Sequence, residues 1–440
     1  MGYTSEVRFK SIIGSSEVGE QFVGSTAHPG TLFAFGINHK TAPVEIREKL
    51  HLRDDEIVAF LRQLSRYLTE CVVLSTCNRT EIYAVSESSE IDPNDLVDLL
   101  IDFKGAREMV RNDHFFALIS CAATQQLFNV ATSIDSLVIG DSQILRQLRA
   151  AYDIARDNGR VGKVLHQLFQ RAFKLGKTTY TETSIHAGAV SVSLAAVELG
   201  VETFGSLRGR SALVIGAGEM ARITAEALAN RHIGRITVTN RTRANAEEMV
   251  ASLQPDISVD CAVLEFDKFR GRLSEFDMVV SSTASDEPIL YAADFAAIER
   301  KMLAIDIAVP RDIDPEAGQL PKLNLKNIDD LRSIFDGHHE KRMRDLPKVK
   351  SMIVAEMVGF LTWYYMLPIL PVYEKTHGKP SVDRVHEIMK VKRFLDQNLS
   401  EIHRLAARSG GNFQDDLVSH FELIKKLRSL KARAFAAAAP

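Results

Sequence analysis

The segment Ser211–Leu228 reads SALVIGAGEMARITAEAL and carries the clearest structural signal in the chain. A short apolar run before the glycines predicts a buried strand, and the periodic run after them predicts a helix. The turn between them lets backbone amides and the helix N-terminus approach a pyrophosphate closely. This turn comprises Gly216, Ala217, Gly218, Glu219, Met220 and Ala221. Ala221 replaces the third glycine of the usual pattern, where only a small residue is needed. We expect a dinucleotide site here, with a turn that binds no nucleotide as the alternative.

Three further apolar runs follow at the spacing of strand–helix–strand crossovers, which predicts a parallel α/β sheet of dinucleotide-binding type. They are RITVTN (235–240), FDMVVSST (276–283) and MLAIDIA (302–308). Where an NAD enzyme places an acid for the ribose hydroxyls, the chain instead has Asn240, Arg241 and Thr242. Arg241 can supply charge to a 2′-phosphate, so we expect NADPH rather than NADH. Alternatively, Arg241 is a solvated residue at a helix start.

The region before this sheet alternates short apolar runs with helical patterns, which predicts a small α+β domain. Residues 123–170 then show helical periodicity with few breakers, and 180–199 repeat it. We therefore predict a long helical connector between the first domain and the second. Residues 1–30 lack the apolar run of a signal peptide and are interpreted as a flexible extension.

The region after Asp330 is almost wholly helical in pattern. Extended helices late in a chain usually pair with something, most simply a second subunit. The most apolar stretch, Met357–Tyr373, contains Pro368 and Pro371 and is preceded by Glu356. These residues are awkward in a spanning helix of about 20 residues, so we favour a buried interface helix over a membrane span.

The composition describes an ordinary soluble protein. With 440 residues, of which 45% are hydrophobic, the chain can bury more than one core and should form two or three domains. The net charge of -3 gives no overall attraction to polyanions, so any nucleic-acid contact must come from local basic surface. The cysteines are scattered without CxxC pairs, which argues against a disulfide framework or a zinc module and suits a reducing cytosol. We expect a cytoplasmic protein and no metal site.

One cysteine has a distinctive setting. Cys77 ends an apolar run and is followed at once by Asn78, Arg79, Thr80 and Glu81. A neighbouring guanidinium such as that of Arg79 stabilises the thiolate form, although it could equally hold a substrate carboxylate. An inert cysteine at a strand end is the alternative, since free cysteines are usually buried. Together with a reduced nicotinamide cofactor, a nucleophilic cysteine fits acyl transfer to sulfur, hydride delivery to the thioester and release of an aldehyde.

Several segments carry a signal beyond periodicity: GINHKTAPVEIREKL from Gly36, VVLSTCNRTEIYAV from Val72, SIDSLVIGDSQILRQLRAAY from Ser133, GAVSVSLAAVEL from Gly188, VIGAGEMA from Val214 and DIAVPRDIDP from Asp306. Jointly they resemble the glutamyl-tRNA reductases of tetrapyrrole biosynthesis. The resemblance spans about residues 31–360, and STCNR is its most specific part. It implies a V-shaped homodimer with a catalytic arm, a long connecting helix, an NADPH domain and a helical dimerisation domain. The implied boundaries are 1–30 for the extension, 31–184 for the catalytic domain with the start of the connecting helix, 185–335 for the NADPH domain and 336–440 for the dimerisation domain.

The resemblance also implies roles for individual residues. Cys77 looks like the nucleophile that accepts glutamate from glutamyl-tRNA(Glu) to give, after reduction, glutamate 1-semialdehyde. Arg79 would hold the glutamate carboxylate with a planar fork. The other implied substrate contacts are Thr76, Asn78, Ser136, Asp141, Ser142, Gln143 and Gln147. Without the resemblance, Ser136 and Asp141 could equally be helix caps with polar surface beside them.

One position departs from the family pattern. Gln126 stands where the family typically has a histidine, and glutamine can orient a group but cannot exchange a proton near neutral pH. Any acid–base role there is lost or taken by another group, and His39 and His114 are the candidates we note. The departure leaves open a regulatory relative with weak turnover, and a shikimate-dehydrogenase-type oxidoreductase is a second alternative because its nucleotide domain is similar.

The expected partners are charged tRNA and a second subunit. Candidate tRNA contacts on the connector are Arg160, Lys163, Arg171, Lys174 and Lys177, and a second group is Lys341, Arg342, Arg344, Lys348 and Lys350. Solvated helix faces explain both groups equally well. The resemblance further suggests partnership with glutamate-1-semialdehyde aminomutase, because the aldehyde product is reactive.

Overall fold

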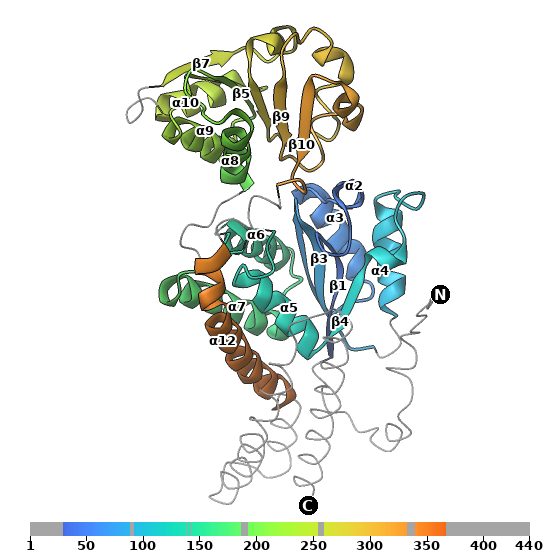
Figure 1. The fold of residues 1–440 in the computed structure, drawn as a ribbon. Coiled ribbons are helices and arrows are strands. Elements are labelled where there is room, and N and C mark those ends of the chain that lie inside the picture. Colours follow the sequence, from blue (N-terminus) through green and yellow to red (C-terminus); the bar gives the residue numbers. More distant parts are fainter. Residues whose placement is uncertain are drawn as a thin grey trace, which may run out of the picture.

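The computed structural model describes residues 30–88, 92–137, 139–141, 143–185, 192–253, 259–331 and 339–366. They form two bodies joined near α2 and β10, with α12 lying along the first body (Figure 1). The expected extension, apart from residue 30, and the chain after residue 366 lie outside the described residues. The predicted dimerisation domain is therefore represented only by α12.

The first body is built on a four-stranded antiparallel sheet in the order β2-β3-β1-β4. The strands are β1 (Thr31–Asn38), β2 (Glu70–Thr76), β3 (Arg79–Ser86) and β4 (Phe116–Ile119). The helices between them are α2 (Val44–Lys49), α3 (Asp54–Leu64), α4 (Pro93–Phe103) and the short η1 (Asn112–His114). β1 and β3 are buried almost throughout because helices cover the sheet. This confirms the predicted α+β domain.

The predicted single connector is wrong in form. The region is divided into three helices, α5 (Cys121–Ala131), α6 (Gln143–Asp157) and α7 (Lys163–Glu182), which pack into the first body. Ser133, Gly140 and Gly159 have positive φ angles of 60°, 91° and 67°, and left-handed residues of this kind end helices. The helical periodicity seen in the sequence is present in the structure, but these breaks divide the region into three separate helices.

The longest described helix comes after the nucleotide domain instead. α12 (His339–Met366) returns to the first body and packs on α5 and α7. Met357, Phe360 and Tyr364 are buried in the core of that body, as expected for a packed helix rather than a membrane span. None of the helices in the described ranges is long and apolar enough to cross a membrane. The rest of the apolar stretch, residues 367–373, lies outside those ranges.

The second body is a six-stranded parallel sheet in the order β10-β9-β8-β5-β6-β7. Its strands are β5 (Ser211–Ile215), β6 (Arg235–Thr239), β7 (Asp260–Leu264), β8 (Met278–Ser281), β9 (Met302–Asp306) and β10 (Leu323–Asn327). The helices are α8 (Val192–Phe204), α9 (Glu219–Asn230) and α10 (Arg243–Leu253), with the short η2 (Arg270–Glu275), η3 (Ala292–Phe295) and η4 (Pro315–Gln319). The strand order reverses beside β5, where ligands bind in open α/β sheets. The predicted parallel sheet is confirmed.

Candidate active site

Cys77 lies at the tip of a tight hairpin. Thr76 at the end of β2 pairs with Arg79 at the start of β3, so Cys77 and Asn78 are the two residues of the turn. The Asn78 amide donates to Thr76 Oγ1 at 3.2 Å, and Asn78 O accepts from His39 N at 2.9 Å. Cys77 also packs against the apolar cluster of the nucleotide-binding body. The thiol is thus presented on a fixed turn toward the second sheet.

The surroundings of the thiol keep it protonated in this state. Burial of the sulfur among protein atoms, together with the carboxylate of Asp141, raises the pKa of Cys77 to about 11. Arg47 and Arg79 act in the opposite direction but do not outweigh burial. Because the thiolate is the nucleophile, attack needs an additional positive charge near Cys77 or the loss of the negative one.

Arg79 is buried in a network of carboxylates rather than turned to solvent. Its Nη1 donates to Glu81 at 2.8 Å and to Asp135 at 3.0 Å, and Nη2 donates to the Asp135 carbonyl oxygen. Gln126 Nε2 donates to the same two carboxylates, at 3.1 Å to Glu81 and 2.9 Å to Asp135. Burial raises the pKa of Glu81, whereas Arg79 overcomes burial and holds the pKa of Asp135 well below its usual range. Gln126 therefore orients a buried ion network.

The two histidines considered as substitutes for a family histidine lie in different places. His39 lies close enough to Asp135 to lower its pKa. His114 Nδ1 instead accepts the Arg111 amide in the short η1 helix, at 3.2 Å. Of the two, only His39 adjoins the network that contains Gln126.

Most of the proposed substrate contacts gather around the hairpin tip. Buried side-chain atoms without a hydrogen-bond partner among the described residues include Asn78 Oδ1, Arg79 Nε, Ser136 Oγ and Gln143 Nε2. Buried polar atoms are normally paired, so four such atoms at predicted contact positions indicate a site for a polar ligand. Gln147 lies one turn further along α6 and is exposed. Ser142 lies outside the described residues.

A buried arginine connects the hairpin tip to the nucleotide-binding body. The Arg47 side chain is 1% exposed, and its Nε donates to the Cys77 carbonyl oxygen at 3.3 Å. Its Nη1 and Nη2 donate to the two carboxylate oxygens of Asp329 at 3.2 and 3.0 Å. Asp329 follows β10, the edge strand of the second sheet. The backbone of the candidate nucleophile is therefore held from both bodies.

The glycine-rich turn follows β5 as predicted and has the geometry of a phosphate cradle. Gly216 has φ +109°, and a Cβ there would lie 2.8 Å from the Ser282 carbonyl oxygen, so only glycine fits. A Cβ on Gly218, the N-cap of α9, would meet nothing within 4 Å. Ala221 is fully buried in the helix–sheet core, the packing role expected of the third position. Open space beside a helix N-terminus fits a pyrophosphate.

The residues after β6 fit a nucleotide that carries an extra phosphate. Asn240 Nδ2 donates to the Thr242 carbonyl oxygen at 2.9 Å, which shapes the turn before α10. Arg241 is exposed and forms no ion pair with other described residues. The buried hydroxyls of Thr239 and Ser282, on either side of β5, also have no hydrogen-bond partner in the described chain. These groups lie at the edge of the sheet where a nucleotide binds in folds of this type.

Comparisons with known proteins agree with this arrangement. The family model described as "Glutamyl-tRNAGlu reductase, N-terminal domain" matches residues 35–183, and the model "Shikimate / quinate 5-dehydrogenase" matches residues 198–334. The glutamyl-tRNA reductase of Chlorobaculum parvum is 39% identical over 385 residues, which cover 86% of this chain and 89% of that protein. The chain belongs to the glutamyl-tRNA reductase family.

Other members of the glutamyl-tRNA reductase family show similar coverage. The protein of that name from Chloroherpeton thalassium is 37% identical over 368 residues, covering 82% of this chain and 83% of that one. The solved structure of glutamyl-tRNA reductase from Methanopyrus kandleri is 28% identical, covers 92% of this chain and 98% of that chain, and has a TM-score of 0.41. As a member of this family, the chain is an oxidoreductase.

Four residues at the site of this glutamyl-tRNA reductase family member were not predicted from the sequence. Glu81 had a usable signal, because Arg79 and Glu81 stand two apart on β3 and so face the same side of the sheet. Asp135 lies 56 residues after Arg79, and no spacing in the sequence connects the two. Arg47 and Asp329 are separated by 282 residues, and no local pattern predicts their contact.

Proposed function

We propose that the chain reduces glutamyl-tRNA(Glu) to glutamate 1-semialdehyde with NADPH, the first step of 5-aminolevulinate and tetrapyrrole synthesis. The observation that carries this proposal is the position of Cys77, which packs against the nucleotide-binding body at a hairpin tip. Beside it, Asn78 Oδ1 and Arg79 Nε are buried and have no hydrogen-bond partner among the described residues. A thiol in that position can take an acyl group on one side and present it to a nicotinamide on the other.

The first step is acyl transfer. The Cys77 sulfur attacks the ester carbonyl carbon of glutamyl-tRNA, a C–S bond forms and the C–O bond to the tRNA ribose breaks. The ribose hydroxyl leaves with the proton that the thiol gives up. Gln143 Nε2 and Asn78 Oδ1 are the buried groups that position the glutamyl group, and Arg79 Nε is the remaining donor for its carboxylate.

Substrate binding itself favours the reactive form of the thiol. Burial is the largest cause that raises the pKa of Cys77, and the Asp141 carboxylate is the second. The α-ammonium group of the glutamyl substrate would offset the Asp141 charge when both lie in the site. The pKa of Cys77 then falls when substrate is present, which limits the reaction of the free thiol with other electrophiles.

The second step is reduction of the thioester to the aldehyde. NADPH, when bound, would supply the hydride for this reduction, and the Cys77 sulfur would leave the carbonyl carbon as the thiolate. Gly216 and Gly218 would allow close approach of the pyrophosphate, and Asn240, Arg241 and Thr242 would hold the 2′-phosphate. The Arg47–Asp329 pair keeps the nucleophile and the nucleotide-binding body together during this step.

The same proposal includes the wider assembly. We propose that the chain forms a cytoplasmic homodimer with the domain boundaries that the resemblance implies. We also propose that it associates with glutamate-1-semialdehyde aminomutase, which consumes the aldehyde. Direct transfer is the physical reason for such a partner, because a free aldehyde reacts with amines. If the two purified proteins neither associate nor protect the aldehyde, this part of the proposal is wrong.

The deciding experiment follows NADPH oxidation after addition of charged glutamyl-tRNA. We expect Cys77→Ser to abolish oxidation and the acyl–enzyme adduct in intact-protein mass spectrometry. Cys261→Ser is the matched control, because Cys261 is also a partly buried free cysteine but lies on β7. Equal activity of Cys77→Ser and wild type would favour the shikimate-dehydrogenase-type alternative.

A second arm tests the position that departs from the family pattern. A wild-type chain that binds tRNA but neither forms the adduct nor oxidises NADPH would favour the regulatory alternative. Gln126→His places an imidazole between Glu81 and Asp135, two acceptors that favour its protonated form. A gain in turnover in this variant would show that proton transfer at this position limits the natural chain.

A further inference from the structure

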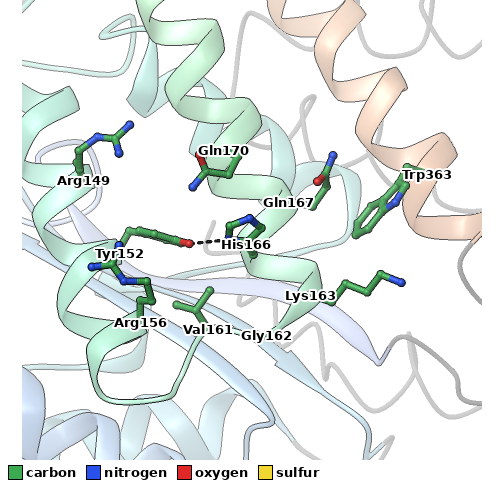
Figure 2. Close-up of a pocket in the computed structure, with 10 residues that line it drawn as sticks. All are labelled: Arg149, Tyr152, Arg156, Val161, Gly162, Lys163, His166, Gln167, Gln170 and Trp363. Carbon is green, nitrogen blue, oxygen red and sulfur yellow. Dashed lines mark hydrogen bonds between the residues drawn. The ribbon is translucent and has the colours of Figure 1, made fainter.

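A shallow pocket of about 560 Å³ lies on the first body, away from the hairpin tip. The end of α6, the start of α7 and one residue of α12 form its walls (Figure 2). The residues that line it are Arg149, Tyr152, Arg156, Val161, Gly162, Lys163, His166, Gln167, Gln170 and Trp363. The function proposed for the site at Cys77 gives this pocket no role.

The pocket carries positive charge. Three of its lining residues are arginine or lysine and none is acidic, although Arg156 is paired with Asp153 and Asp157 beside it. Arg149 and Lys163 are exposed and form no ion pair with the part of the chain that the structure describes. These two cations are therefore available to an anionic ligand, and phosphates bind such groups strongly.

Aromatic and amide groups stand beside these cations. Trp363 projects from α12 toward the pocket, and the Tyr152 hydroxyl and His166 Nδ1 are joined by a hydrogen bond of 2.7 Å (Figure 2). Arg149 lies over the Phe173 ring, with 4.1 Å between its Cζ and the ring centroid, so its guanidinium is held against that ring. Gln167 and Gln170 add amide donors and acceptors along α7. Trp363 is partly exposed, and cations beside such a ring are the pattern that binds a nucleic-acid strand through phosphate and base.

The helix α6 links this pocket to the candidate active site. Its first residue, Gln143, belongs to the group around Cys77, and its later turns carry Arg149 and Arg156. At 1.5 Å per residue, these two side chains branch from the helix about 9 and 20 Å beyond Gln143. A nucleic acid that delivers its terminal ester to Cys77 has its next few nucleotides within this range.

We infer that this pocket binds the sugar-phosphate backbone and an unpaired base of the substrate tRNA, close to its aminoacylated end. The inference rests on the proposed function, because it names the part of the protein that holds the tRNA while Cys77 reacts. Lys163 and Arg149 contact phosphates and Trp363 stacks on a base. Of the connector residues predicted to contact tRNA, Lys163 is retained. Arg171 is not, because it pairs with Glu356 at 2.5 Å and fastens α7 to α12.

Trp363 provides a direct test because it is the single tryptophan of the chain. We expect uncharged tRNA to quench its fluorescence in the full chain, with weaker binding at higher salt. Lys163→Gln should flatten the plot of log affinity against log salt by about 0.7–0.9, the amount expected for one lost phosphate contact. Lys174→Gln is the matched control, since Lys174 is an exposed lysine on the same helix outside the pocket, and it should leave the slope unchanged.

Turnover separates this inference from the proposed function. With charged tRNA, Lys163→Gln and Arg149→Gln should raise KM and leave kcat unchanged, and adduct formation from a small glutamyl ester without tRNA should equal that of wild type. Unchanged tRNA affinity in both variants, while wild type still reduces glutamyl-tRNA, would overturn the inference alone. Failure of wild type to reduce glutamyl-tRNA would instead overturn the proposed function.

Two other outcomes would assign the pocket elsewhere. Equal quenching by adenosine monophosphate and by tRNA at the same concentration would identify a site for small nucleotides and refute the tRNA contact. Trp363 fluorescence could instead change with protein concentration and not with tRNA. That result would identify a contact between two copies of the chain and would also refute the tRNA contact.

Discussion

The contact between Arg47 and Asp329 should be among the strongest polar links between the two bodies. Arg47 is 1% exposed and Asp329 is 26% exposed, and two hydrogen bonds of 3.0 and 3.2 Å join them. Removing one partner of a fully buried ion pair costs about 3–5 kcal/mol. Because Asp329 is partly hydrated and asparagine keeps one acceptor oxygen, we expect Asp329→Asn to destabilise the chain by about 1–3 kcal/mol.

A double-mutant cycle isolates this interaction from other effects of each substitution. Arg47→Met, Asp329→Asn and the double variant would be compared by urea unfolding of the full chain, followed by circular dichroism. We expect a coupling energy of about 1–3 kcal/mol. A cycle with Asp330→Asn is the matched control, since the neighbouring Asp330 accepts from the Asn327 amide, and its coupling to Arg47 should be near zero.

The two single variants should shift the pKa of Cys77 in opposite directions. Arg47 lowers the pKa of Cys77, so Arg47→Met should raise that pKa further. Asp329→Asn leaves the guanidinium charge less neutralised, so it should lower the pKa of Cys77. The pH dependence of Cys77 alkylation by iodoacetamide measures both shifts. Shifts of the same sign, or a coupling energy near zero, would refute the view that this pair links the thiol to the nucleotide-binding body.

Three further outcomes follow from the geometry of the site. In the ligand-free chain, the rate of Cys77 alkylation should rise with pH up to about 11. Asp141→Asn should make alkylation faster at pH 8, because it removes a negative charge that raises the pKa of Cys77. Alkylation of the natural chain at pH 7 as fast as that of free cysteine would contradict both expectations. Gly216→Ala should destabilise the fold, whereas Gly218→Ala should fold normally and bind NADPH more weakly, as measured by thermal unfolding and by titration. Arg241→Gln should weaken NADPH binding about 10- to 100-fold, the loss of a charge-assisted contact to phosphate, and leave NADH affinity unchanged, a pattern that calorimetry would reveal or exclude.

The sequence was most informative where one local pattern determines one structure. The run from Ser211 predicted the strand, the tight turn and the helix, because glycine at Gly216 satisfies a positive φ that other residues avoid. The polar run from Asn78 to Glu81 was less exact, since only Asn78 belongs to the turn and β3 already begins at Arg79. By contrast, periodicity suggested one connector where the chain makes three helices. A single left-handed residue such as Ser133 is enough to change direction, and serine rarely signals this.

The electrostatics of the site could not be predicted in the same way. Arg79 was expected to face a thiolate or a substrate carboxylate, and the structure places most of its donors on Glu81 and Asp135. The direction of a pKa shift depends on which charged groups tertiary packing places within a few ångströms. Asp135, which contacts Arg79, lies 56 residues further along the chain. Sequence spacing constrains neighbours along a strand or helix, but not charges that meet across the fold.

On the proposed function, the helix α6 contributes to the handling of both the tRNA and the dinucleotide. The backbone amide of its first residue, Gln143, donates to Asp141, whose charge acts on Cys77, and its later turns line the proposed tRNA pocket. Also in the first turn of α6, Arg146 forms an ion pair with Glu219, the first residue of α9. An acid at that position would repel a pyrophosphate, and the guanidinium of Arg146 offsets this charge from the other body. Because α6 carries all three groups, one helix connects the surroundings of the thiol, the start of the helix after the glycine-rich turn and the pocket proposed to bind tRNA.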